Sequence, residues 1–142
     1  MNILISACLV GVKCRYDGGA GKIAELSELM EKHTLIPVCP EQLGGLKTPR
    51  EPAEIKGERV VTRDGRDVTH EYRRGAEETL RLARLYGCSC AIMKERSPSC
   101  GSGQIYDGTF SRTLTVGSGV TAALLEETGI KVFGESEISK LL

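Results

Sequence analysis

The sequence has few residues suited to contact with nucleic acid. It contains no tryptophan and only four tyrosines and two phenylalanines among its 142 residues. So few aromatic side chains provide little for a surface that stacks bases. The 19 basic residues are balanced by 19 acidic residues, so the formal net charge is zero. A neutral chain lacks the basic footprint of proteins that bind long nucleic acids or anionic membranes.

Long apolar runs are also missing. No stretch approaches the ~20 apolar residues of a membrane span. The first apolar run, residues 2–5, is short and has no basic residues before it, unlike a secretory signal. We therefore expect a soluble cytoplasmic protein without a membrane partner. In that compartment the six cysteines are not expected to form disulfides. Their alternatives are metal or cluster ligation, catalysis, or burial as small apolar side chains.

Hydrophobic periodicity predicts strands that alternate with helices. Strands are expected at residues 2–7, 35–38, 89–93 and 130–133, and helices at residues 22–33, 70–86 and 120–127, with a helical turn at 136–142. Residues 42–57 are expected to form a loop, followed by a hairpin that turns at Asp64-Gly65. Pro37 disfavours a central place for its strand. The pattern predicts one α/β domain over residues 1–142, a Rossmann-like sandwich with a mainly parallel sheet flanked by helices.

Three cysteines follow directly after predicted strands. Cys8 and Cys39 end the first two, and Cys100 lies in the loop after the third. Open parallel sheets place their sites beyond the carboxyl ends of the strands, so we expect these thiols to meet at one edge. Soft thiolates suit either zinc or an iron–sulfur cluster.

The cysteine spacing bears on that choice. The sequence has no CxxC pair of the kind that structural zinc usually uses. Three loops with one cysteine each would fit a [4Fe–4S] cluster with one open iron, a Lewis acid comparable to a catalytic metal. Cys14, six residues after Cys8, is the candidate for a fourth ligand; the alternative is a nearby loop thiol that is not bonded to the cluster.

The loop at residues 97–103 reads Ser-Pro-Ser-Cys-Gly-Ser-Gly. It combines a thiol, three hydroxyls and two glycines. Glycines allow the backbone to approach a bound group closely and to expose its N–H donors. A plain turn is the alternative, because serine, proline and glycine all favour turns.

Three motifs together resemble the thiouracil desulfidase family, in order and over nearly the whole chain. They are Ser6-Ala7-Cys8-Leu9 with Cys14-Arg15-Tyr16-Asp17-Gly18; Pro37-Val38-Cys39-Pro40-Glu41 with Gly44-Gly45-Leu46 and Pro49-Arg50; and Ser97-Pro98-Ser99-Cys100-Gly101 with Ile105-Tyr106-Asp107-Gly108-Thr109-Phe110. Any one of them alone would be a weak signal. The combination is specific.

The resemblance implies a [4Fe–4S] cluster held by only three cysteines, Cys8, Cys39 and Cys100. It also implies a non-redox reaction on a thiolated uracil, supplied as base, nucleoside or nucleotide. The sulfur of the pyrimidine binds the iron that has no protein ligand, water replaces the sulfur on carbon, and sulfide leaves on the cluster. The catalytic carboxylate and serine of the family fall on Glu41 and Ser97.

The chemistry of these residues agrees with the implied roles. Glu41, two residues from a ligand, is placed to activate water; a salt-bridged loop carboxylate or a helix cap is the alternative. Ser97 and the backbone of residues 101–103 could donate hydrogen bonds to the tetrahedral intermediate, although Ser97 also reads as a turn hydroxyl. Further candidates for contact with the substrate are Arg15, Tyr16, Asp17, Ser99, Gly101 and Ser102.

Other assignments remain open in the sequence. Arg15, Tyr16 and Asp17 could instead form a solvated turn with an internal ion pair. Arg50 could hold a nucleotide phosphate or pair with a nearby glutamate, Glu51 or Glu54. The alternative for the whole protein is a non-catalytic metal-binding or iron–sulfur redox-sensing module. In it the same cysteines would hold zinc or a closed four-cysteine cluster, so the number of cysteine ligands separates the two hypotheses.

Overall fold

The computed structural model describes residues 1–142 and is built around a four-stranded sheet. Its strands are β1 (Asn2–Ser6), β2 (Thr34–Val38), β5 (Cys90–Ile92) and β8 (Lys131–Phe133). They lie in the order β2-β1-β5-β8, and all pairings are parallel. The predicted α/β fold with a parallel sheet is confirmed. β2 is an edge strand, which suits Pro37 because proline has no backbone N–H to donate to a neighbouring strand.

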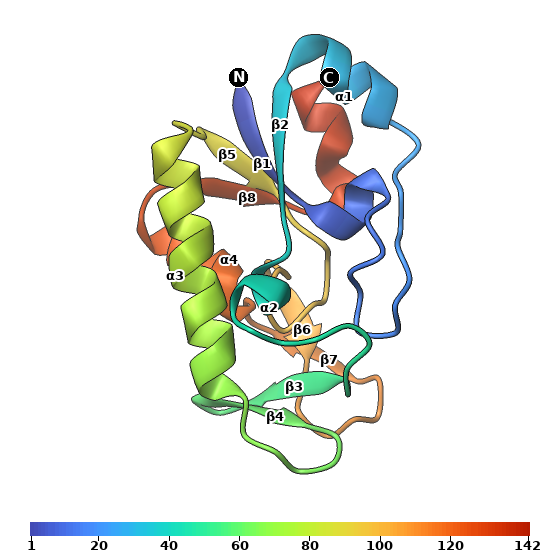
Figure 1. Cartoon of the computed structure of the whole chain (residues 1–142), viewed down its shortest axis with the longest axis vertical. Coiled ribbons are helices and arrows are strands. Elements are labelled where there is room, and N and C mark those ends of the chain that lie inside the picture. Colours follow the sequence, from blue (N-terminus) through green and yellow to red (C-terminus); the bar gives the residue numbers. More distant parts are fainter.

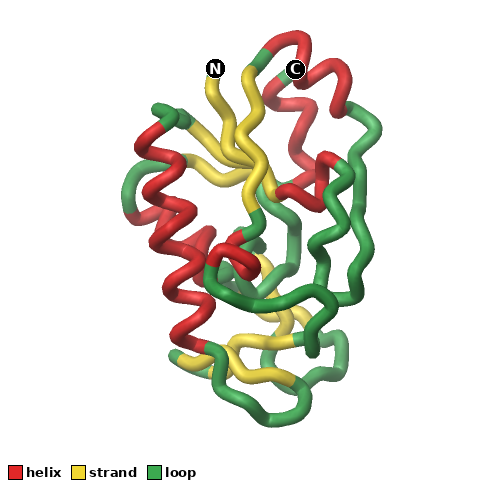
Figure 2. Tube along the Cα trace, in the orientation of Figure 1, coloured by secondary structure: helices red, strands yellow, loops and turns green.

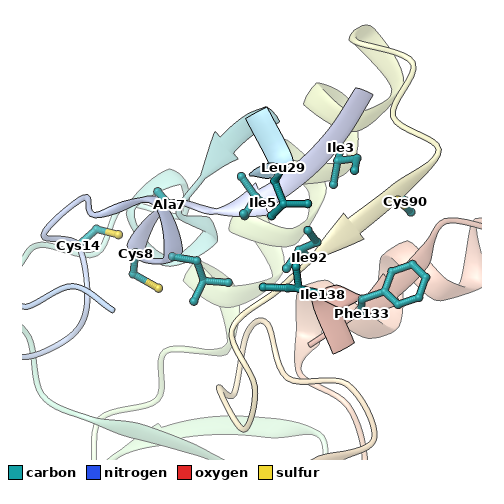
Figure 3. Close-up of a cluster of buried hydrophobic side chains, with 11 residues drawn as sticks. Ile3, Ile5, Ala7, Cys8, Cys14, Leu29, Cys90, Ile92, Phe133 and Ile138 are labelled. Atoms are coloured by element: carbon teal, nitrogen blue, oxygen red, sulfur yellow. The ribbon is translucent and has the colours of Figure 1, made fainter. Parts of the chain in front are cut away.

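Helices cover both faces of the sheet, because side chains alternate along each strand. Ile3 and Ile5 of β1 pack with α1 (Leu26–Lys32) and the 3₁₀ helix η2 (Glu135–Leu141), through Leu29 and Ile138 (Figures 1 and 3). Leu4 faces the other way, toward α3 (Thr69–Leu85) and α4 (Val120–Glu127). The result is the predicted sandwich. None of these helices combines the length and the apolar character needed to cross a bilayer.

The prediction of a loop at residues 42–57 is confirmed for residues 44–52 and wrong at both ends of the segment. A short helix, α2 (Pro40–Leu43), enters this segment, and β3 (Ala53–Lys56) ends it. β3 pairs with β4 (Arg59–Thr62), and Gly57 turns the hairpin with a φ of +61°. The expected turn at Asp64-Gly65 also forms, with one bridge between Val61 and Asp67, but it is secondary to the β3–β4 pairing. A second hairpin joins β6 (Gln104–Tyr106) to β7 (Leu114–Val116).

The helix expected at residues 22–33 is shorter, because regular α-helix begins only at Leu26. The helix expected at residues 70–86 corresponds closely to α3. Both hairpins lie beyond the carboxyl ends of the parallel strands (Figure 1). Long loops connect the sheet with this region (Figure 2). Loops therefore make up much of the chain between the sheet and the hairpins, and functional side chains commonly gather on loops.

Candidate active site

A cavity of about 390 Å³ lies at the carboxyl edge of the sheet. The chain leaves β1 toward β2 on one side of the sheet and leaves β5 toward β8 on the other. Such a reversal opens a crevice in which α/β proteins bind ligands. The cavity is lined by four cysteines, Cys8, Cys14, Cys39 and Cys100, and by Glu41. The expected meeting of three thiols at one edge of the sheet is what the structure has.

Local structure places each sulfur after a strand. Cys8 lies in the 3₁₀ helix η1 (Ala7–Val10), which continues β1 and is closed by Gly11 in a left-handed conformation (φ +101°). Cys39 is the N-cap residue between β2 and α2, and Pro40 begins that helix. Cys8 and Cys14 are buried at one end of the core cluster, past the end of β1 (Figure 3).

Burial keeps most of these thiols protonated. Desolvation raises the pKa of Cys100 to about 12, with a smaller contribution from Glu41. Burial and the adjacent Cys39 raise the pKa of Cys14 to about 12. Burial also raises the pKa of Cys8, against the opposing effect of Lys94. A metal centre that binds these sulfurs must therefore displace their protons, as is general for thiolate ligands.

The donor set fits a cluster better than a single ion. A zinc ion needs its thiolates at about 2.3 Å from one point. No three cysteine, histidine or acidic side chains gather tightly enough to hold one ion. The four cysteines instead line one shared cavity of about 390 Å³. Soft thiolates that line such a space suit an iron–sulfur cluster.

Glu41 points into this cavity from the first turn of α2 and is held by two donors. Arg50 Nε donates to Glu41 Oε1 over 2.9 Å, and the hydroxyl of Tyr72 donates to the same oxygen over 2.8 Å. The side chains of Arg50 and Glu41 are only 7% and 16% exposed. No protein donor reaches Glu41 Oε2. The salt-bridged carboxylate and the candidate base are therefore the same group.

Arg50 forms its ion pair with Glu41. The alternative from the sequence, a pair with Glu51 or Glu54, is wrong. Its other nitrogens donate to the Cys14 carbonyl (2.9 Å) and to Thr48 Oγ1 (2.9 Å). Burial alone would lower the pKa of Arg50, but the Glu41 carboxylate, with smaller contributions from Cys39 and Tyr72, raises it overall. With its donors committed in this way, Arg50 joins the Cys14 loop to α2 and is not free to bind a phosphate.

Ser97 stabilises the turn that presents Cys100. Its hydroxyl oxygen accepts hydrogen bonds from the backbone N–H groups of Ser99 (3.1 Å) and Cys100 (3.0 Å). The interpretation of Ser97 as a turn hydroxyl is therefore confirmed for the hydrogen bonds that its oxygen accepts. Ser97 also lines the cavity, so its own O–H proton can be donated to a bound group.

The expected substrate contacts divide into two groups. Arg15 and Tyr16 line the cavity, whereas Asp17, Ser99, Gly101 and Ser102 do not. The Asp17 side chain accepts from the Gly19 backbone, and Arg15 makes no ion pair with it. Ser99 is buried against Thr121. The Ser102 hydroxyl donates to Glu126.

Gly101 has a packing reason for its identity. A Cβ at this position would stand 2.9 Å from Arg96 N and Ser97 O. The Ser97–Gly103 loop is therefore compact, with only part of it facing the cavity.

The sequence analysis singled out Arg15 and Arg50 but not the four other basic side chains that line the cavity. Six basic residues line the cavity against two acidic ones, Glu41 and Glu95; the basic residues are Arg15, Arg50, Arg63, Lys94, Arg96 and Arg112. Arg96 and Arg112 have positive φ angles of 66° and 61°, a backbone region that such residues rarely adopt. Uncommon backbone conformations of this kind cluster at functional sites. The neutral net charge of the chain conceals this local concentration.

Comparison with known proteins identifies the family over nearly the whole chain. The model of a family described as 2-thiouracil desulfurase matches residues 3–137. YbbK of Bacillus subtilis (strain 168), described as uncharacterized, is 46% identical over 150 residues, covering 99% of both chains. A solved structure, the [4Fe-4S]-dependent thiouracil desulfidase TudS, matches with a TM-score of 0.94 and 48% identity, covering 99% of this chain and 94% of that one. This chain belongs to the 2-thiouracil desulfurase family, and the resemblance of its three cysteine motifs is confirmed.

Proposed function

We propose that this chain is a [4Fe–4S]-dependent desulfidase that converts a thiolated uracil to uracil and releases sulfide. Family membership and the 48% identity to a thiouracil desulfidase support the reaction class. The observation that carries the proposal is the convergence of Cys8, Cys39 and Cys100 with Glu41 on one cavity. Residues 1–142 would act as a single functional domain.

Cys8, Cys39 and Cys100 would hold the cluster, each from a different strand end. One iron would then have no protein ligand, and the bound cluster would supply a Lewis acid for the soft sulfur of the substrate. Cys14 lines the same cavity, and its backbone carbonyl accepts a hydrogen bond from Arg50. We assign Cys14 to the wall of the site and not to the cluster.

The protein groups supply proton transfer and orientation. Glu41 Oε2 has no protein donor, so it can accept a proton from the water that attacks the thiocarbonyl carbon. The O–H of Ser97 can donate to the negative charge that develops on a heteroatom of the tetrahedral intermediate, while its oxygen stays fixed by two backbone amides. Arg15 and Tyr16 would contact the pyrimidine or its substituent.

The charge of the cavity favours an anionic form of the substrate. Apart from Arg50, which is paired with Glu41, and Lys94, which is paired with Glu135, four arginines line the wall. Guanidinium groups bind phosphate by paired hydrogen bonds. We therefore expect a thiouridine monophosphate to bind more tightly than the free thiolated base.

A closed four-cysteine centre is the competing function, because Cys14 lies beside the three proposed ligands. Such a centre would leave no iron open and would act in sensing or structure without turnover. It predicts a coloured protein that releases no sulfide.

The direct test is sulfide release by the anaerobically reconstituted protein. Thiouracils with sulfur at position 2 or 4, and their nucleotides, would be offered in turn. We expect sulfide from the wild type, and from Glu41→Ala the same visible absorption without sulfide. Glu51→Ala, an exposed acid nearby, is the matched control and should retain activity. A coloured wild type that releases no sulfide from any of these compounds would contradict the proposal.

A further inference from the structure

Tyr72 is a buried residue that no step above uses. It lies in the first turn of α3, the residue is 2% exposed, and its hydroxyl donates to Glu41 Oε1 over 2.8 Å. Burial raises the pKa of Tyr72 well above 10, and the adjacent Glu41 carboxylate adds to that shift. The phenol therefore keeps its proton and remains a donor throughout the neutral pH range.

The hydrogen bonds on Glu41 are asymmetric. Arg50 Nε from the loop after α2 and the Tyr72 hydroxyl from α3 both donate to Oε1, and no protein group donates to Oε2. Two donors at one oxygen fix the rotation of the carboxylate. The remaining oxygen is then available to the cavity, which Glu41 and Tyr72 both line.

The helix that carries Glu41 cannot provide this order alone. α2 has only four residues, and isolated helices of that length are unstable. Its contact with the 17-residue α3 supplies the support, and Tyr72 is the α3 residue that reaches the catalytic carboxylate. Small displacements of a catalytic group cost large factors in rate.

We propose that Tyr72 is a positioning residue, whose hydroxyl holds Glu41 so that Oε2 is presented to the attacking water. The inference rests on the proposed role of Glu41 as the base. It requires that loss of the hydroxyl impairs turnover more than it impairs substrate binding. It also requires that the contribution of the hydroxyl to stability disappears when Glu41 is absent.

The test uses Tyr72→Phe in the cluster-containing enzyme, because phenylalanine keeps the ring and removes only the donor. The free energy of a hydrogen bond to a charged group corresponds to a factor of about 10 or more in rate, so we expect kcat to fall about tenfold. KM and the visible absorption should not change. Tyr86→Phe, a half-exposed tyrosine at the other end of α3, is the matched control and should have the wild-type kcat.

A second measurement tests the contact without turnover. The urea midpoints of the cluster-free wild type, Tyr72→Phe, Glu41→Ala and the double variant form a double-mutant cycle. Non-additive midpoints, together with the fall in kcat, support the proposal. Additive midpoints, or a Tyr72→Phe enzyme with unchanged kcat, overturn it while the desulfidase assignment stands. A coloured wild type that releases no sulfide would instead overturn the proposed function, on which the inference rests.

Discussion

Gly44, the C-cap residue of α2, and Gly75 of α3 bring the backbones of the two helices into direct contact. A Cβ at Gly75 would lie 1.9 Å from the carbonyl oxygen of Pro40, and a Cβ at Gly44 would lie 1.9 Å from that of Glu71. Only residues without side chains allow this approach. The contact holds the short helix that carries Glu41 and follows Cys39, so the position of both residues depends on two glycines with no chemical role.

Gly75→Ala should therefore separate α2 from α3. Overpacking of this kind typically costs about 1–3 kcal/mol, and we expect a loss of that size in the free energy of urea unfolding. Cluster content should fall as well, because Cys39 moves with α2. Gly21→Ala is the control: nothing lies within 4 Å of its added methyl, so its stability should stay the same or rise slightly. Equal stability of the two variants would contradict this account of the helix contact.

Glu54 secures the β6–β7 loop that carries Arg112. Its buried carboxylate oxygen Oε1 accepts from the backbone N–H groups of Gly108 (2.9 Å) and Phe110 (3.1 Å). Glu54→Ala would leave both donors without a partner, at a cost of about 2 kcal/mol. We expect faster amide exchange at residues 108 and 110 and a higher KM for the substrate. Glu54→Gln keeps an acceptor oxygen, so its amide exchange should lie between that of the wild type and that of Glu54→Ala. Identical exchange in all three proteins would disprove the role of Glu54.

Glu135 makes the stability of the fold sensitive to acid. Its burial opposes the charged form, but hydrogen bonds from Lys94 and the Glu95 backbone outweigh burial and lower the pKa of Glu135 below its ordinary value of 4.5. A carboxylate with a lowered pKa stabilises the folded state above the unfolded pKa, and that stabilisation is lost as the pH falls through the folded pKa.

Glu135→Gln should accordingly lower the urea midpoint of the cluster-free protein at pH 7 and flatten its decline below about pH 4.5. Glu127→Gln, an exposed residue without an ion pair, should keep the wild-type decline. If Glu135→Gln followed the wild-type curve at every pH, the Lys94–Glu135 pair would not contribute to stability.

The basic wall of the cavity predicts a dependence on substrate charge. Arg112→Ala should raise KM several-fold for a thiouridine monophosphate and leave KM for the free base nearly unchanged. Added salt should weaken binding of the nucleotide in the wild type, because exposed charge interactions are screened. Arg81→Ala, on the exposed surface of α3, is the control. An equal effect of Arg112→Ala on base and nucleotide would remove the electrostatic argument.

The sheet and its sulfurs were predictable from local sequence. A short continuous apolar run identifies β1, and a cysteine after each of three strands suffices to place Cys8, Cys39 and Cys100 at one edge once the strands are parallel. The three motifs then indicated the family. These features depend on periodicity and on order along the chain, which a sequence displays directly.

The support of the site was not predictable, because it depends on contacts between distant segments. Tyr72 is 31 residues from Glu41, and nothing in the charged first half of α3 distinguishes it from a core residue. β3 and α2 have four residues each, too few for a periodic signal, and they form because β4 and α3 pack against them. Ser99 and Ser102 looked like ligand contacts, but their hydroxyls bond to α4 residues that follow about 20 positions later.

The proposed reaction requires that three cysteines hold the cluster and leave one iron open. The decisive measurement is the visible absorption and sulfide release of four anaerobically reconstituted variants: Cys8→Ser, Cys14→Ser, Cys39→Ser and Cys100→Ser. We predict that three of them lose the cluster absorption, while Cys14→Ser keeps both the absorption and the release of sulfide. Bleaching of Cys14→Ser to the level of the others would show a closed four-cysteine centre and contradict the account.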